Sequence, residues 1–260
     1  MNAIICMKQV PDTETRFQVR DDKIVEEGIQ YVVNPYDEYA IEECLLKKEA
    51  AGEGKVTVIC MGPDRAREAI LQALALGCDE AIHLNDPAFE GADAFTAAAV
   101  LAAAVKKVGQ YDFIFTGKQG VDNDNAQVGI LLAEMLDLPH VSVVTKLEVA
   151  SDKSQATAQR EVEGGKQVVE TLLPAVFSAQ KGINEPRYPS FRGIRQARSK
   201  PYITWTAADL GFDPATLSPK SELVSVALPP ERGGGQVIEG EPAEAAKELV
   251  RLLREEAKVI

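Results

Sequence analysis

Histidine is scarce in this chain of 260 residues, which contains only His83 and His140. Many metal centres and the Ser-His-Asp and Cys-His catalytic centres depend on histidine. His140 follows Pro139 at the start of an expected strand, where a structural role is the simpler interpretation. No G-x-S-x-G nucleophile motif is present either. We therefore expect no metal site and no bond chemistry performed by side chains.

The usual phosphate loops are also absent. No G-x-x-x-x-G-K-[ST] sequence occurs, which excludes a P-loop NTPase, and no G-x-G-x-x-G follows a strand. The four cysteines form no C-x-x-C pair and lie in or beside apolar segments, so we expect buried free thiols in a reducing compartment. They are Cys6, Cys44, Cys60 and Cys78.

Basic residues are outnumbered, 28 against 40 acidic residues, which gives a net charge of −12. This balance excludes binding to nucleic acid through a basic face. No apolar run approaches the ~20 residues that span a bilayer, and no secretory signal is recognisable, so we expect no membrane insertion and a cytoplasmic location.

Alternating strand and helix patterns fill the first two-thirds of the chain and predict a mostly parallel sheet with helices on both faces. Expected strands are 3–7, 56–61, 81–84, 112–116 and 141–145, and expected helices begin at Asn34-Pro35 and cover 65–76, 93–108 and 126–136. Asn34 is a suitable N-cap, and Asp37 and Glu38 suit the first helical turn. Residues 23–25 and 31–33 resemble a small hairpin around Gly28.

The pattern changes after about Leu147. Residues 157–163 and 167–172 predict an antiparallel β-hairpin around Gly164-Gly165. A basic, proline-containing segment follows, and residues beyond about Ser199 have too few apolar runs to form a core. We expect a nucleotide-binding domain over 1–198, with a docking loop at 184–200, and an extended C-terminal arm over 199–260.

The most informative stretch is Gly117–Gly129, which follows the apolar run Phe113-Ile114-Phe115 and precedes the apolar run Ile130–Ala133. The N–H groups at the start of a helix after such a turn favour phosphate. This stretch is therefore the candidate nucleotide site.

Six motifs in order resemble the β subunit of electron transfer flavoprotein. They are Lys8–Asp12, Val33–Glu43, Ala73–Asp79, Gly117–Gly129, Leu173–Val176 and Asn184–Phe191. The resemblance covers residues 1 to about 200 and, loosely, the tail. It implies a three-layer, Rossmann-like fold of the adenine-nucleotide-hydrolase-like type, with a C-terminal arm that reaches around a larger α subunit. It also implies a shared FAD held mainly by the α subunit, AMP or a second FAD in the β subunit, and exchange of electrons with dehydrogenases of the acyl-CoA dehydrogenase type and with a quinone reductase or another acceptor.

The resemblance places the nucleotide contacts on four segments that follow strands of the expected sheet. The residues are Cys6, Asn34, Pro35, Tyr36, Asp37, Met61, Asp122, Asn123, Asp124, Asn125, Ala126, Gln127, Val128, Gly129, Ile130, Leu131, Leu132 and Ala133. We expect the backbone of residues 126–129 to bind the phosphate. Asp122 and Asp124 would repel phosphate, so a ribose hydroxyl or helix capping is the expected role for them.

The partner-docking residues implied by the resemblance are Asn184, Glu185, Pro186, Arg187, Tyr188, Phe191 and Ile194. The family anchors a dehydrogenase with a leucine at the position of Phe191, and an exposed aromatic residue suits a wider pocket.

Three alternatives stay open at this level. The first is a subunit of an electron-bifurcating flavoprotein that binds a second FAD, because Ala126–Gly129 resembles the version found in many such members. The second is a stand-alone adenine-nucleotide-binding regulator, and the third is an adenylating enzyme, which the missing pyrophosphate loop disfavours.

Overall fold

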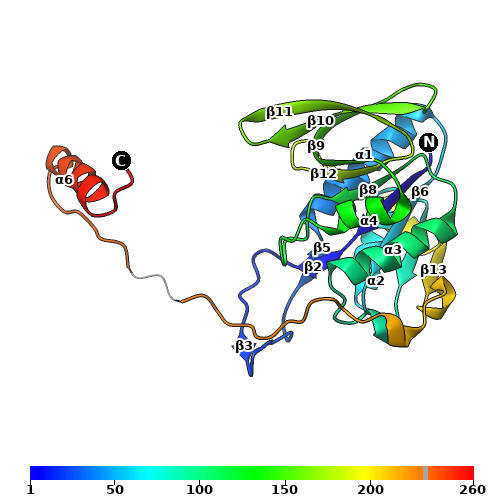
Figure 1. The fold of residues 1–260 in the computed structure, drawn as a ribbon, viewed down its shortest axis with the longest axis horizontal. Helices are drawn as coiled ribbons and strands as arrows, with labels where there is room; N and C mark the ends of the chain where they lie inside the picture. Colours follow the sequence, from blue (N-terminus) through cyan, green and yellow to red (C-terminus); the bar gives the residue numbers. More distant parts are fainter. Residues whose placement is uncertain (231–233) are drawn as a thin grey trace. The chain divides into compact units, whose positions relative to one another are not determined.

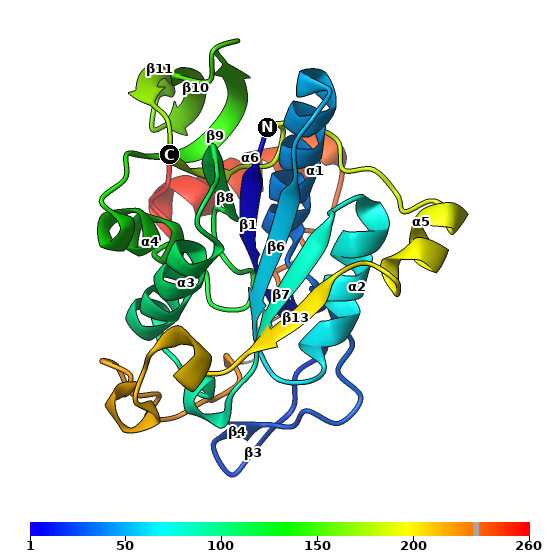
Figure 2. The same ribbon diagram turned by 90° about the vertical axis from the view of Figure 1, so that its right-hand side faces the viewer.

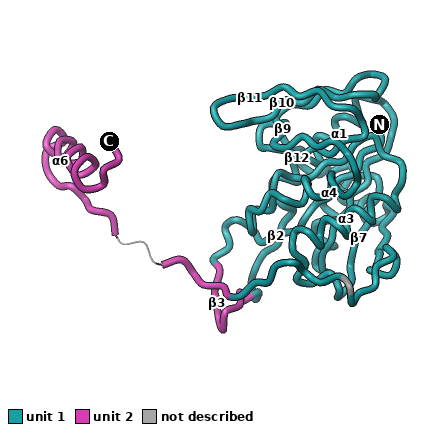
Figure 3. The backbone as a smooth tube through the Cα atoms, viewed as in Figure 1, with its two compact units in different colours: residues 1–16, 26–224 teal, residues 17–25, 225–260 magenta. Residues whose placement is uncertain are grey.

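The computed structural model describes residues 1–230 and 234–260. These residues form two compact units, which are coloured separately in Figure 3. The first contains residues 1–16 and 26–224, and the second contains residues 17–25 and 225–260. The candidate nucleotide site and the candidate docking loop both belong to the first unit.

A nine-stranded sheet forms the centre of the first unit, in the order β11-β10-β9-β12-β8-β1-β6-β7-β13. Every neighbouring pair from β9 to β13 is parallel, and β10 pairs antiparallel with both β9 and β11. The strands are β1 (Ala3–Met7), β6 (Val56–Met61), β7 (Glu80–Leu84), β8 (Phe113–Gly117), β9 (His140–Val149), β10 (Gln155–Val162), β11 (Gly165–Leu172), β12 (Val176–Ala179) and β13 (Tyr202–Trp205).

Helices cover both faces of this sheet (Figures 1 and 2). Helices α1 and α2 pack on one face, over a core that includes Phe113, Phe115 and Phe177, and α3 and α4 pack on the other, over Ile4 and Ile114. The helices are α1 (Pro35–Ala51), α2 (Ala66–Leu76), α3 (Ala94–Val108), α4 (Val128–Leu136), α5 (Phe191–Ala197) and α6 (Pro242–Glu255), with short 3₁₀ helices at Pro87–Phe89, Ala208–Leu210 and Pro214–Thr216.

The sequence pattern predicted this α/β class correctly, because strands such as β1 and β8 are buried along their whole length and must be apolar on both faces. The expected β-hairpin is the β10–β11 pair. Strand β13 adds the edge next to β7, so the first residues of the expected arm belong to the sheet.

The hairpin expected around Gly28 is wrong. Strand β5 (Tyr31–Val33) pairs with β2 (Gln9–Pro11), and β4 (Lys23–Ile24) pairs with β3 (Val19–Arg20). The β2–β5 pairing buries Val10 and Val33 almost completely, whereas Lys23 and Ile24 stay exposed. Burial of apolar side chains therefore outweighs the turn signal of Gly28.

The second unit contains β3, β4 and α6. Helix α6 has no buried residue among its fourteen, and its apolar side chains include Leu249 and Val250, which are exposed. None of the helices in the described parts of the chain is long and apolar enough to cross a bilayer.

Candidate functional site

The carboxyl ends of β1, β6 and β8 lie side by side at one edge of the sheet. Cys6 in β1 is in register with Ile59 in β6 and with Thr116 in β8. Met61 ends β6 at the same edge. In open parallel sheets ligands bind outside the carboxyl ends of the strands, so this edge is where a nucleotide site is expected.

Asn34 precedes α1 but does not cap it with its side chain. Its amide nitrogen donates to the carbonyl of Gln119 at 2.8 Å, and its amide oxygen accepts from the backbone N–H of Val121 at 3.2 Å. The side chain expected to cap the helix thus fixes the Gly117–Gly129 stretch instead.

Asp37, in the first turn of α1, has a buried carboxylate that joins two other segments. One oxygen accepts from the backbone N–H of Lys8 at 2.7 Å and the other from that of Gly117 at 2.8 Å. Burial raises the pKa of Asp37 to about 7, against the opposing effect of these hydrogen bonds and of Asn34. A Cβ on Gly117 would lie 2.3 Å from the Asp37 carboxylate, so only glycine fits at this position.

The acidic residues of the stretch make contacts within it. Asp122 forms an ion pair with the ammonium of Lys8 at 2.5 Å, and Asp124 accepts from the side-chain amide of Gln119. Both Asp124 and Ala126 have positive φ, at 52° and 53°. Because of this backbone conformation α4 begins at Val128, two residues later than expected.

The start of α4 carries no side-chain cap. Helices α1, α2 and α6 also lack a side-chain cap, whereas Asp93 caps α3 through the N–H of Thr96 and Ser190 caps α5 through the N–H of Gly193. An uncapped helix start with a glycine in its first turn leaves backbone N–H groups for an anion. The adjacent hydroxyl of Thr116 is buried without a hydrogen-bond partner in the described structure, and a Cβ on Gly129 would lie 2.7 Å from it. This arrangement fits the phosphate of a nucleotide.

Most of the nucleotide residues implied by the resemblance lie at this edge, at the start of α1, in the loop before α4 and in its first turn. Cys6, Asn34 and Asp37 are buried, whereas Asn123 and Asn125 are exposed. Two of the eighteen lie elsewhere, because Leu132 and Ala133 face the core between α4 and the sheet. The pattern gave no signal for Thr116, and it included Lys8 only as part of a motif.

The expected docking residues divide into two groups. Asn184 donates to the carbonyl of Tyr39 and to the carboxylate of Glu43, both at 3.0 Å, and Arg187 pairs with Glu42 and Glu49 at 2.8 and 2.6 Å. These contacts attach the loop to α1. The i, i+7 spacing of Glu42 and Glu49 places both on one helix face, which is the sequence signal for this attachment.

The side chains of three other docking residues are exposed on the surface of the first unit. Tyr188 and Phe191 are 94% and 95% exposed, and Ile194 is 53% exposed. Glu185 and Pro186 lie between Asn184 and Arg187 in the attached part of the loop. Short helix α5 lies tightly on α2, since a Cβ on Gly193 would come within 2.2 Å of the Ala75 carbonyl oxygen.

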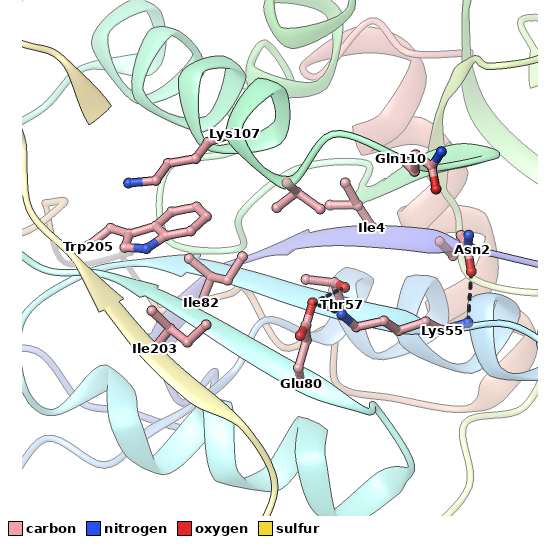
Figure 4. A pocket seen from close by; sticks show the side chains of 12 residues that line it. Asn2, Ile4, Lys55, Thr57, Glu80, Ile82, Lys107, Gln110, Ile203 and Trp205 are labelled. Carbon is pink, nitrogen blue, oxygen red and sulfur yellow. Dashed lines mark hydrogen bonds and ion pairs between the residues drawn. The ribbon is translucent and has the colours of Figure 1, made fainter. Parts of the chain in front are cut away.

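A surface pocket lies on the α3 face, near the amino ends of β1, β6 and β7 (Figure 4). Several of its polar groups have partners: Glu80 binds Lys55 and Thr57, and the ammonium of Lys107 donates to the carbonyl of Asp209 and lies 4.4 Å from the centre of the Trp205 ring. None of the residues expected to bind a nucleotide lines this pocket.

The cysteines behave as expected. All four are buried and free, and burial raises the pKa of the Cys60 and Cys78 thiols to about 12. Within the described ranges no group of histidine, cysteine, aspartate and glutamate side chains is arranged to hold a metal ion.

The sheet order and the helices on both of its faces define a Rossmann-like α/β protein. Residues 22–210 match the electron transfer flavoprotein domain family. Over 261 residues the chain is 41% identical to the electron transfer flavoprotein subunit β of Bacillus subtilis, and the match covers 100% of each chain. It is 38% identical to the caffeyl-CoA reductase-Etf complex subunit CarD of Acetobacterium woodii and 35% identical to the β subunit from Methylophilus methylotrophus, each over 98% of both chains. The chain belongs to the electron transfer flavoprotein β subunit family.

Proposed function

We propose that this chain binds AMP at the edge formed by β1, β6 and β8 and works in a heterodimer with an α subunit that carries the redox FAD. The observation that carries the proposal is the uncapped start of α4, with Gly129 in its first turn and a glycine-containing loop in front of it. A single phosphate satisfies one such helix start. FAD shared with the α subunit would supply the electron-carrying chemistry, whereas this chain contributes binding and positioning.

The backbone N–H groups of residues 127–129 are the proposed phosphate donors. The ammonium of Lys8 neutralises the charge of Asp122, and the carboxylate of Asp124 accepts a hydrogen bond from the amide of Gln119 within the loop. Cys6, Met61 and the backbone of residues 34–37 are proposed to surround the rest of the nucleotide.

A second candidate is a subunit that holds a second FAD in place of AMP, as in electron bifurcation. Two observations favour it: the Ala126–Gly129 sequence, and the similarity to a subunit whose name places it in a caffeyl-CoA reductase–Etf complex. Full-length similarity to β subunits favours either heterodimer over a stand-alone regulator.

Acid release of the cofactors from the purified heterodimer separates the two candidates. The proposal expects one FAD and one AMP per heterodimer. Two FAD and no AMP would replace it with the second candidate, and a chain that elutes as a monomer or homodimer after co-expression with an α subunit would contradict both.

We further propose that Tyr188, Phe191 and Ile194 form the contact with an electron donor of the acyl-CoA dehydrogenase type. Their exposure on a loop that α1 and α2 hold in place supports this role. Exposed aromatic side chains on a fixed support are typical anchors of interfaces. A quinone reductase is the proposed acceptor, and the amphipathic α6, with no buried residue, is the proposed contact of the C-terminal arm with the α subunit.

A further inference from the structure

Of the two acidic residues in the first turn of α1, only Asp37 is buried. Both of its carboxylate oxygens accept hydrogen bonds from backbone N–H groups. Glu38, its neighbour, is half-buried and lies 3.5 Å from the side-chain amide of Gln72. Asp37 instead connects the end of β1, through Lys8, with the end of β8, through Gly117. Asp37 therefore links the carboxyl ends of two of the strands that form the candidate nucleotide edge.

We propose that Asp37 is a positioning residue of the nucleotide site, which fixes the start of the 117–127 loop to the end of β1 and does not contact the nucleotide with its carboxylate. The inference rests on the proposed function for the identity of the ligand. It changes the role that the family resemblance assigns to Asp37, from a ligand contact to a support of the loop.

The geometry supports this role in two ways. Both carboxylate oxygens have short hydrogen bonds to backbone amides, so neither is directed at a ligand. Asn34 adds two hydrogen bonds to the next residues of the same loop, at Gln119 and Val121. The turn that precedes α4 is thus held from its first residue to its fifth by one turn of α1.

The charge state of Asp37 matters because an ionised carboxylate accepts at both oxygens, whereas a protonated one donates at one of them. Protonation therefore weakens the hydrogen bond that the N–H of Lys8 or of Gly117 donates to that oxygen. The ionisable groups that face Asp37 are the thiols of Cys6 and Cys60 and the ammonium of Lys8, which is paired with Asp122. Burial raises the pKa of both thiols, so they stay neutral around pH 7.

The first test is hydrogen exchange of the full chain without nucleotide, as protection factors corrected for intrinsic rates. Asp37→Asn should lower protection at Lys8 or Gly117 roughly 10- to 100-fold, the range for loss of a hydrogen bond to a buried charged group. Ile5 and Ile59, in the middle of β1 and β6, should keep their protection. Glu38→Gln, in the same helical turn, is the matched control and should change neither.

A pH profile provides a test that needs no variant. In the wild-type chain the protection of these two amides should rise as the pH increases through about 7, where Asp37 ionises. Protection in Asp37→Asn should be flat over the same range. An equal loss of protection across β1 and β6 in the variant would show a merely structural role and overturn the proposal.

The heterodimer gives the functional test, with AMP as the probe. Asp37→Asn should release AMP faster than wild type and than Glu38→Gln, while the α-bound FAD stays in place. Loss of amide protection with unchanged AMP release would also overturn the positioning role. If the wild-type heterodimer contains neither AMP nor a second FAD, the proposed function fails, and the exchange experiment still decides whether Asp37 fixes the loop.

Discussion

Helix α1 holds two loops, and it holds them for opposite purposes. Asn34, just before α1, and Asp37, in its first turn, bind the 117–127 loop, and later turns bind the 184–190 loop through the carboxylates of Glu42, Glu43 and Glu49. Asn34 and Asp37 attach the first part of the 117–127 loop to the protein, whereas its residues 122–125 are exposed. The second is attached by its polar residues and leaves Tyr188 and the adjoining Phe191 in solvent.

The difference shows what each site requires. A small anionic ligand needs backbone N–H groups in a fixed arrangement, and buried hydrogen bonds fix a backbone most firmly. A protein partner needs apolar side chains that stay exposed until it binds, and ion pairs at the base of a loop provide this without covering them. Helix α1 therefore takes part in a buried hydrogen-bond network at its start and in surface ion pairs with the 184–190 loop along its length.

The largest predicted effect is on nucleotide retention and concerns the first loop only. Gly129→Arg should abolish retention of the nucleotide while the heterodimer still assembles, because even a Cβ would lie 2.7 Å from the Thr116 hydroxyl. Nucleotide content after gel filtration measures the effect. Glu134→Arg, on the exposed side of the same helix, is the control and should keep the nucleotide. Unchanged nucleotide content in Gly129→Arg would remove this site assignment.

The next effect concerns the ion pairs of Arg187 that attach the second loop to α1. Arg187→Ala leaves the buried Glu42 without its ion pair and should destabilise the protein by about 1–3 kcal/mol. This lies below the range for a fully buried pair, because the Arg187 side chain is 33% exposed. Urea unfolding measures the change, and Arg195→Ala, an exposed arginine of α5, is the control. Equal losses of unfolding free energy in the two variants would show that the ion pairs of Arg187 do not hold the loop.

Phe191→Ala sharpens the comparison, since it should affect docking and not folding. Because the Phe191 side chain is 95% exposed, its removal should change the free energy of unfolding by less than about 0.5 kcal/mol. If it anchors the interface, electron transfer from an acyl-CoA dehydrogenase should slow roughly 10- to 30-fold, with the FAD retained. Val168→Ala, 68% exposed on β11, is the matched control. Rates equal to wild type would exclude Phe191 from the interface.

The smallest effect is a difference in pH dependence between the two loops. Hydrogen bonding to Arg187 lowers the pKa of Glu49, so its contribution to stability is present above its unfolded pKa of about 4.5 and is lost as the pH falls through the lower folded value. Glu49→Gln should thus cost about 0.2–1 kcal/mol at pH 7 and nothing in strong acid. Thermal unfolding at several pH values measures this. If the stability difference between wild type and Glu49→Gln changes near pH 7, the titrating group is not Glu49.

Much of the site could be predicted from the sequence, because apolar strands and glycine-containing turns follow one another in order. The strands β1, β6 and β8 and the Gly117–Gly129 stretch were recognisable in this way. The role of Asn34 was not, since an Asn-Pro pair before a helix indicates a cap, and its true partners are 85 and 87 residues away. The Gly28 hairpin failed for a similar reason, because Val33 pairs with the distant β2.

The sequence by itself determined the family, the α/β class and the segments that meet at the candidate nucleotide edge, since these follow from local periodicity and motif order. The tertiary structure decided which polar groups are used internally and which stay free. It buried Asp37 between β1 and β8, paired Arg187 with α1 and left the start of α4 uncapped. The physical reason is that a hydrogen bond depends on positions in space, which the chain sets only when distant segments pack together.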